Sequence, residues 1–325
     1  MDKQTMYNFI AGPAEKCHVL VVGDVMLDKY YYGEVTRISP EAPVPITHVT
    51  RQKETLGGAA NVAHNLARLG CQIGLAGYVG EDYHCQSLTD KLTAQGIEFR
   101  GLITTNRPTT TKLRVIGGHQ QMIRLDFEEP EEMTGPYAER LHNFVDSRLA
   151  EGVDAVIISD YGKGACTAET CRKIIEIAAQ QNIPVLVDPK GTDWDKYRGA
   201  DYITPNFKEL SAVLPMKIKN QDEDIEKGAR FVMKNFGIKQ VLATRSEHGM
   251  SLVMENGVTH IPTRAQEVFD VSGAGDTVIG VFALGLAGGV TPETSAYMAN
   301  LAASVVVAKL GTYAVSKEEL LEVLK

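Results

Sequence analysis

The run CHVLVVGD at residues 17–24 is the part of this 325-residue chain that decides its fold. Its apolar residues are continuous and end at a Gly-Asp pair, so a short buried strand followed by a turn is predicted. Similar runs recur at 72–79, 154–159 (DAVIIS), 184–187 (PVLV), 202–204 and 240–244 (QVLAT). Helical spacing lies between most of them, over 59–66, 168–181 and 222–236. This alternation predicts an α/β fold in which a mostly parallel sheet is flanked by helices.

Two stretches interrupt the alternation of strands and helices. Residues 30–51 are rich in β-forming residues and proline, and residues 97–129 hold several β-like runs around Gly117-Gly118. A pair of glycines between alternating runs is typical of a hairpin. We therefore expect 30–51 and 97–129 to form a small antiparallel sheet that projects from the main body. Because no repeat or linker divides the chain, residues 1–325 are predicted to form a single domain with this appendage.

Composition excludes several classes of protein. A hydrophobic content of 44% rules out a disordered chain, and a net charge of −8 without basic blocks argues against a nucleic-acid or membrane-surface binder. The longest apolar stretch, 277–290, is interrupted by glycines and too short to span a bilayer. The first residues lack the apolar core of a signal peptide. Five cysteines without a CxxC are typical of reduced thiols, so a cytoplasmic protein is predicted.

The segment DVSGAGDTVIG, residues 270–280, is the most informative for chemistry. Its small residues precede Asp276 and a helix-like apolar run, and a glycine-rich turn at a helix N-terminus presents N–H groups that favour negative charge. A carboxylate there can accept the proton of a hydroxyl that attacks a phosphoryl group, while the amides stabilise the transferred oxygens. The alternative is that Asp276 only caps the helix. The segment alone does not decide between these two interpretations.

Several other catalytic motifs are absent from the sequence. There is no GxxxxGK[ST], HExxH or GxSxG, SGAGDT lacks the third glycine of the dinucleotide fingerprint, and the histidines show no metal-ligand spacing.

A second segment, GGAANVAHNLARLG at 57–70, places Gly57-Gly58 ahead of a helix and Asn61 in its first turns. The two glycines either let the backbone approach a ligand closely, with Asn61 able to donate and accept hydrogen bonds, or simply form a tight turn.

Together the two segments resemble the two signatures of the ribokinase-like carbohydrate kinase family, an early GG…N…A…L…LG and a late D-x-x-G-A-G-D. Seven motifs, one of which contains the late signature, resemble the bacterial D-glycero-β-D-manno-heptose 7-phosphate kinases of that family: GEVTRISPEAPVPI, SDYGKG, DPKG, TPNFKE, TRSEHGM, DVSGAGDTV and KLGTYAVS. This likeness runs from about Val19 to the end. It implies a ribokinase-like fold in which the projecting sheet is a lid.

The resemblance also implies an activity. That activity is ATP-dependent phosphorylation of the anomeric hydroxyl of D-glycero-D-manno-heptose 7-phosphate to the 1,7-bisphosphate, a step of ADP-heptose synthesis for lipopolysaccharide. Two alternatives stay open: a kinase of another small sugar or nucleoside on the same fold, and a catalytically silent sugar-binding sensor.

Roles for single residues follow from the same resemblance. Asp276 would be the catalytic base, and Gly273, Ala274 and Gly275 would form the anion hole. Asn206 and Glu209 would hold Mg²⁺ through water near the triphosphate of ATP, although their spacing also suits a capping box. Contacts with the nucleotide would come from Thr244, Gly249, Asn300 and Ala303. Contacts with the sugar would come from Asp24, Asp28, Gly57, Gly58 and Asn61, with Lys190 at a nearby strand end.

The phosphate already carried by the acceptor needs a cationic clamp. Lys112 and Arg114 are two apart and share one face of a predicted strand, and Arg124 and Asp126 alternate in the same way. That face would cover an anionic sugar if the strands form the lid, or it is only the solvated face of an edge sheet. Lys163, in SDYGKG, is a further candidate for the clamp.

Three further points concern a monovalent cation, the oligomeric state and a domain that many relatives carry. Val271 stands where the wider family usually has threonine, which leaves a monovalent cation near Asp270 an open question. The exposed edges and apolar underside of a lid predict a homodimer formed through it. Many relatives carry a fused nucleotidyltransferase with an HxGH motif, which these 325 residues lack. A kinase-only protein and the kinase half of a fusion both fit.

Overall fold

The computed structural model describes residues 3–118, 120–264, 268–309 and 311–325. Its centre is a nine-stranded sheet in which neighbouring strands are parallel, except that β12 runs antiparallel to β11 and β13. In spatial order the strands are β13 (Gly257–Ile261), β12 (Met250–Met254), β11 (Gln240–Thr244), β10 (Tyr202–Ile203), β9 (Val185–Asp188), β8 (Ala155–Ser159), β1 (His18–Gly23), β4 (Gln72–Val79) and β5 (Glu98–Thr104).

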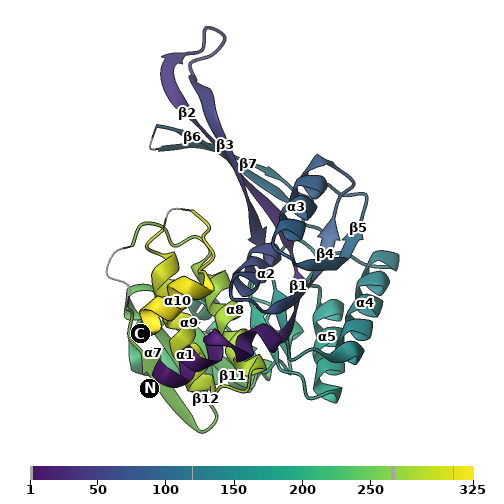
Figure 1. Cartoon of the computed structure of the whole chain (residues 1–325), viewed down its shortest axis with the longest axis vertical. Coiled ribbons are helices and arrows are strands. Elements are labelled where there is room, and N and C mark those ends of the chain that lie inside the picture. The colour runs from purple at the N-terminus through teal and green to yellow at the C-terminus, as the bar shows by residue number, and fades with distance from the viewer. Residues whose placement is uncertain (1–2, 119, 265–267, 310) are drawn as a thin grey trace.

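Helices cover both faces of this sheet (Figure 1). Because side chains alternate along a strand, Val19 and Val21 of β1 enter one core and Leu20 and Val22 enter the other. The first core is closed by α1 (Lys3–Ala11), α2 (Ala59–Arg68), α8 (Ala274–Ala287), α9 (Pro292–Val306) and α10 (Lys317–Leu324). The second core is closed by α4 (Pro136–Gly152), α5 (Ala168–Gln180) and α7 (Asp222–Phe236). Helix α3 (Tyr83–Ala94) adds Leu88 and Leu92 to the first core, and α6 (Phe207–Val213) adds Leu210 to the second.

The predicted alternation of strands and helices is confirmed. The strands at 72–79 and 240–244 and the helix at 222–236 have the predicted bounds, and the others agree to within two residues. No helix among the described residues is long and apolar enough to cross a membrane.

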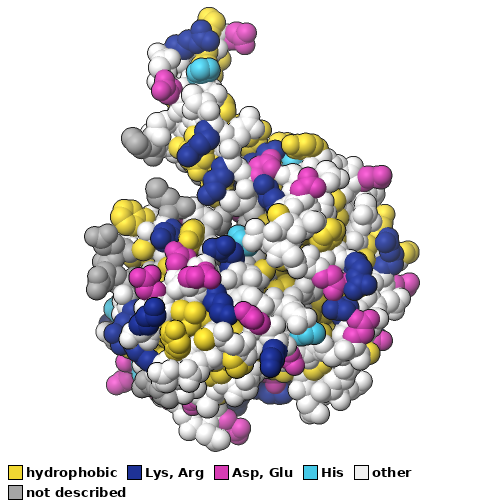
Figure 2. Space-filling model, viewed as in Figure 1, with side chains coloured by type: hydrophobic (Ala, Val, Ile, Leu, Met, Phe, Trp, Pro, Cys, Tyr) yellow, Lys and Arg dark blue, Asp and Glu magenta, His cyan; other side chains and the backbone are white. Residues whose placement is uncertain are grey.

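A second sheet projects from the body and is called the projecting sheet below (Figures 1 and 2). Its strands, in spatial order, are β3 (Pro45–Gly58), β2 (Val25–Ile38), β6 (Thr111–Gly117) and β7 (Gln120–Phe127). The predicted hairpin at Gly117-Gly118 joins β6 to β7, and residue 119 lies outside the described residues.

The predicted extent and pairing of the projecting sheet were wrong in three respects. Residues 98–104 form β5, which extends the main sheet beside β4, because the β4–α3–β5 unit returns the chain parallel to β4. Strands β2 and β3 are longer than 30–51, since their pairing continues down to Val25 and Gly58. The sheet is also mixed, because β2 and β6 run parallel.

The two faces of the projecting sheet differ in character. Register places Asp28 beside Lys112 and Arg114 beside Arg124 on one face, which we call the inner face. Thr55, the partner of Asp28 on β3, bonds through its hydroxyl to that of Thr312 at 2.9 Å, so the inner face is turned toward the body. The opposite, outer face carries apolar residues such as Leu113 and Leu125. A charged surface therefore lies over the end of the body where α8 begins.

Candidate active site

Asp276 occupies the first turn of α8 and is almost completely buried. Helix α8 begins after Gly273, whose φ of +80° is a left-handed conformation that glycine adopts without strain. The carboxylate accepts a hydrogen bond of 2.6 Å from Asn61 Nδ2 and one of 2.5 Å from the Tyr161 hydroxyl. Its oxygens thus face two side chains and do not cap the helix, so the interpretation of Asp276 as a simple cap is wrong.

The hydrogen bond between Asn61 and Asp276 joins two sequence segments that lie 215 residues apart. Asn61 is buried in the first turn of α2, which packs against α8. A Cβ atom at Gly273 would lie 3.0 Å from Asn61 Nδ2, so the absence of a side chain there allows this close approach. The early and late motifs are therefore in direct contact.

The pKa of Asp276 suits a proton acceptor. This pKa is raised from 3.8 to about 6: burial raises it most, the hydrogen bonds from Asn61 and Tyr161 lower it, and the nearby charge of Asp28 raises it. A base with a pKa near 6 is deprotonated at neutral pH and yet can hold a proton, which is the compromise that general base catalysis requires.

Tyr161 is a candidate site residue that sequence reasoning missed, although its motif, SDYGKG, was recognised. It follows β8, and the backbone N–H groups of Tyr161, Lys163 and Ala165 all donate to the carboxylate of Asp24, at 2.7, 2.9 and 3.0 Å. Burial and the neighbouring Asp160 raise the pKa of Asp24, and these three amides lower it. Asp24 therefore holds the loop that brings the Tyr161 hydroxyl to Asp276. Its expected contact with the sugar stays a prediction.

We expect Tyr161→Phe to shift the acidic limb of the pH profile to higher pH. The variant loses a hydrogen bond that lowers the pKa of Asp276, so the fraction of deprotonated base falls at any pH near 6. A bond to a charged group is worth about 1.5 kcal/mol, or roughly one pH unit. Profiles of kcat/KM against pH test this. Tyr78→Phe is the matched control, because that buried hydroxyl has no partner among the described residues. Acidic limbs at the same pH in wild type and Tyr161→Phe would contradict this effect of Tyr161 on the pKa of Asp276.

The first amides of α8 are available to an anion. No side chain among the described residues caps this helix, and the space beside Gly275 is open to 4 Å. Ala274 N–H meets the carbonyl of Val271 at 3.2 Å, so the turn itself is fixed. Open amides at a helix N-terminus favour a negatively charged group. The geometry at Gly273 and Gly275 is therefore compatible with the predicted anion hole, whereas the Ala274 N–H already donates to Val271, and its part in the hole stays a prediction.

Asp28 and Arg114 form an ion pair on the inner face, near Asp276. Arg114 Nη1 lies 2.6 Å from Asp28 Oδ1, and the guanidinium lies over the ring of Tyr30 at 5.2 Å. A Cβ atom at Gly57 would come within 2.5 Å of Asp28 Oδ2, so glycine leaves the room that this carboxylate occupies. The adjacent Gly58 caps α2 with a φ of +54°. Strands β2 and β6 thus carry a fixed pair of opposite charges beside Asp276.

The predicted metal residues lie at the carboxyl end of the main sheet. Asn206 and Glu209 form the capping box of α6, with both hydrogen bonds at 3.0 Å, and Thr244 pairs with Asn206 in a short parallel bridge. Asp188, at the end of β9, is a second residue that sequence reasoning missed. Burial raises its pKa well above the usual range, and the carboxylates of Asp276 and Glu209 raise it further. This concentration of negative charge is what a divalent cation would relieve, so the residues fit Mg²⁺.

The remaining nucleotide and sugar candidates are spread around the same edge. Gly249 ends the turn after β11, Asn300 donates to the carbonyl of Pro262 at 2.8 Å, and Ala303 lies one turn further along α9. Lys190 is exposed after β9, with its Cγ 3.7 Å from where a Cβ on Gly162 would be. None of these four contacts Asp276 directly in a described hydrogen bond. Their roles stay predictions.

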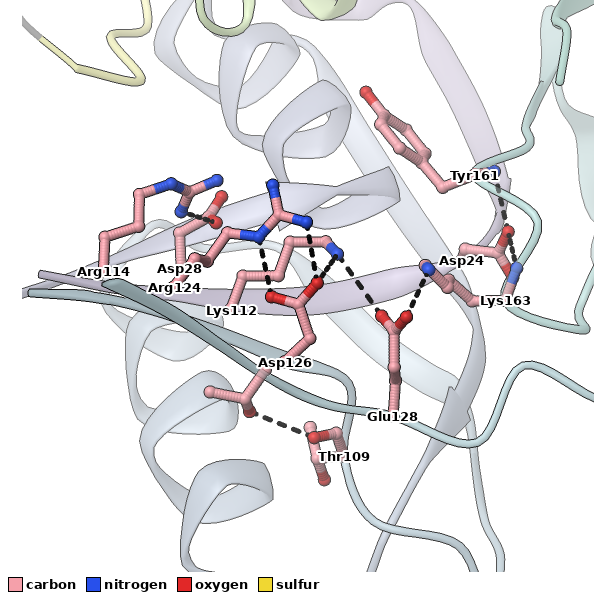
Figure 3. A network of polar contacts seen from close by, with 11 residues as sticks. Asp24, Asp28, Thr109, Lys112, Arg114, Arg124, Asp126, Glu128, Tyr161 and Lys163 are labelled. Carbon is pink, nitrogen blue, oxygen red and sulfur yellow. Dashed lines mark hydrogen bonds and ion pairs between the residues drawn. The ribbon is translucent and has the colours of Figure 1, made fainter. Parts of the chain in front are cut away.

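Four of the predicted clamp residues, Lys112, Arg124, Asp126 and Lys163, form a chain of ion pairs with Glu128, whereas Arg114 pairs with Asp28 (Figure 3). Arg124 holds Asp126 through two bonds of 2.9 Å, and Lys112 lies 3.4 Å from the same carboxylate. Lys112 also lies 3.3 Å from Glu128, which in turn bonds Lys163 at 2.7 Å. The chain runs from the inner face to the loop that carries Tyr161.

Comparison with known proteins identifies the class of this fold and site. Residues 16–319 match the pfkB family of carbohydrate kinases, and the chain belongs to that family. It is therefore a carbohydrate kinase, with a ribokinase-like fold.

Individual relatives agree with this assignment. The chain is 48% identical over 307 residues to the bifunctional protein HldE of Salmonella dublin, covering 94% of this chain and 63% of that protein, so it spans less than two thirds of the relative. Ribokinase from Arabidopsis thaliana, complexed with ribose and ATP, is 22% identical with a TM-score of 0.74 and covers 95% of this chain and 98% of its own. Phosphofructokinase-2 from Escherichia coli, in complex with potassium, is 20% identical with a TM-score of 0.78 and has the same coverage. At these identities the two solved structures establish the fold alone.

Proposed function

We propose that this chain transfers the terminal phosphate of ATP to the anomeric hydroxyl of D-glycero-D-manno-heptose 7-phosphate, giving the 1,7-bisphosphate and ADP. The observation that carries the proposal is the buried Asp276 carboxylate, with a pKa of about 6, beside open amides of α8 and below a cationic inner face. The ordered motifs that resemble heptose 7-phosphate kinases support the choice of acceptor.

The chemistry assigned to the residues is simple. Asp276 accepts the proton of the anomeric hydroxyl as its oxygen attacks the terminal phosphorus of ATP and the bond to ADP breaks. The amides at Gly273, Ala274 and Gly275 stabilise the oxygens of the group in transfer. Asn61 and Tyr161 keep the base in place, since both donate to its carboxylate. Positioning supplies most of the rate enhancement in such a reaction, because phosphoryl transfer needs little covalent help.

Glu209, Asn206 and Asp188 would hold Mg²⁺ with its waters, and bound Mg²⁺ would neutralise charge on the phosphates of ATP. We expect Glu209→Gln to raise the Mg²⁺ concentration for half-maximal rate by about tenfold, since one negative charge near the ion is lost. Glutamine also suits a capping box, so α6 should stay intact. The matched control is Glu319→Gln in the capping box of α10. A Mg²⁺ titration that is the same in Glu209→Gln and wild type would contradict this role.

The acceptor is tested by ADP release under saturating ATP and Mg²⁺. Heptose 7-phosphate should be turned over with a higher kcat/KM than ribose, fructose or fructose 6-phosphate. A clear preference for an unphosphorylated sugar would contradict the proposed acceptor, and sugar binding without any ADP release would indicate a sensor.

We also propose a homodimer formed through the projecting sheet. Large apolar side chains of its outer face, Val35, Val49, Ile123, Leu125 and Phe127, are exposed. An apolar sheet face in water is stabilised when a second copy covers it. Sedimentation at micromolar concentration should give the mass of two chains, and Ile123→Lys should shift it toward one. A wild-type mass of 35.4 kDa would contradict the dimer.

A further inference from the structure

Glu128 lies between two cations of the site and takes no part in the chemistry described above. Its carboxylate contacts Lys163 Nζ at 2.7 Å and Lys112 Nζ at 3.3 Å (Figure 3). Although burial raises the pKa of Glu128, the hydrogen bond and charges of Lys163 and Lys112 outweigh it, so the pKa is held below its usual range. Glu128 is therefore a charged partner of both lysines.

This carboxylate joins two parts of the molecule. Glu128 follows β7 and Lys112 lies on β6, whereas Lys163 belongs to the loop after β8, two residues from Tyr161. The backbone beyond Glu128 is held separately, because Arg107 donates to the carbonyls of Glu129, Glu131 and Glu132. The Glu128 side chain can therefore leave the lysines by rotation about its own bonds while the backbone beside it stays fixed.

The partners of Glu128 differ from those of Asp126, the other acidic residue in the chain of ion pairs. Asp126 accepts hydrogen bonds from Nε and Nη2 of Arg124, the strong bidentate arrangement, whereas Glu128 is held by the two lysines. Three cations (Arg124, Lys112, Lys163) against two anions (Asp126, Glu128) leave 3 − 2 = +1 for the cluster. With Glu128 displaced the cluster carries +2, which matches a phosphate dianion.

We propose that Glu128 is an internal counter-ion that the acceptor's own phosphate displaces from Lys112 and Lys163. This deepens the proposed function, on which it rests, by naming the place where the phosphate of the acceptor binds. A phosphate monoester brings nearly two charges and three acceptor oxygens, and so competes with one carboxylate for two ammonium groups. A neutral sugar cannot do so. Glu128 is thus a specificity-determining residue that favours phosphorylated acceptors.

Binding of inorganic phosphate, measured by calorimetry, tests the inference without reference to turnover. The enzyme is first saturated with Mg²⁺ and a non-hydrolysable ATP analogue, so that the amides of α8 are occupied. We expect Glu128→Gln to bind phosphate about tenfold more tightly than wild type, and Lys163→Gln to bind at least tenfold more weakly. Glu132→Gln, in the same segment but without a side-chain ion pair among the described residues, should match wild type. Unchanged affinity in Glu128→Gln or in Lys163→Gln would overturn the proposal.

A crystal structure of the wild type with phosphate separates displacement from a general effect of charge. The phosphate should contact Lys112 and Lys163, with the Glu128 carboxylate moved away from both. Phosphate bound elsewhere, with Glu128 still on Lys163, would refute the inference. The proposed function is judged separately by the sugar panel, because phosphate binding at this place is measured whichever sugar is turned over.

Discussion

Asp276→Asn is expected to lower kcat by about two to four orders of magnitude, the range for loss of a general base. An asparagine amide keeps the shape of the side chain and can still accept from Asn61, so sugar and ATP should bind with nearly unchanged affinity. Asp224→Asn is a matched control, because Asp224 is likewise the third residue of its helix, α7. A turnover within tenfold of wild type would contradict the role of Asp276 as the base.

The same variant should be at least as stable as wild type at pH 7. In the folded protein Asp276 has a pKa of about 6 against an ordinary value of 3.8, so its carboxyl ionises more readily in the unfolded chain. Ionisation of Asp276 therefore lowers the free energy of unfolding as pH rises from about 4 to about 6. Because asparagine does not ionise, the free energy of unfolding of Asp276→Asn does not fall in this way. Thermal unfolding of both proteins across that range separates a catalytic defect from a folding defect.

Arg114→Gln is expected to raise the KM for the phosphorylated sugar about ten- to a hundredfold, with the KM for ATP within about twofold. The variant removes a positive charge from the inner face and leaves Asp28, which is 5% exposed, without its 2.6 Å ion pair. The uncompensated Asp28 charge should also raise the pKa of Asp276 and move the acidic limb to higher pH.

Two comparisons make the Arg114 result specific. Arg100→Gln, on β5, removes an arginine whose side chain is 75% exposed and should change neither constant. KM for an unphosphorylated sugar, if any turnover is measurable, should respond less than KM for the phosphorylated one. An unchanged KM for the phosphorylated sugar would remove Arg114 from the acceptor site.

The main body and the candidate base, Asp276, were predictable from the sequence because their signals are local. Continuous apolar runs and helical spacing located the strands and helices, and the glycine-rich turn located Asp276. The prediction for β5 failed because its pattern of residues is equally compatible with a strand of either sheet. Only the crossover through α3 places β5 beside β4. Strand pattern shows that a residue is in a sheet, but not in which one.

Partners of the candidate residues were harder to predict, since they depend on contacts between distant elements. The Tyr161 hydroxyl reaches Asp276 only because three amides of its loop converge on Asp24, 137 residues away in the first of those bonds. The alternation of Lys112 and Arg114 did indicate a charged face. It could not show that Glu128, beyond the end of β7, already pairs with one of those cations. Asp188 was passed over for Lys190 in the same motif, because its surroundings of Asp276 and Glu209 exist only in the folded chain.

The central claim is that phosphate is transferred to the anomeric hydroxyl of a sugar that already carries one. The most direct measurement is a ³¹P NMR spectrum of the products formed by the wild-type chain from heptose 7-phosphate, ATP and Mg²⁺. We predict one new sugar-phosphate resonance, coupled to the anomeric proton, that grows in step with ADP while the original phosphate resonance persists. ADP formation without that resonance, or a new phosphate on any other carbon, would contradict the account.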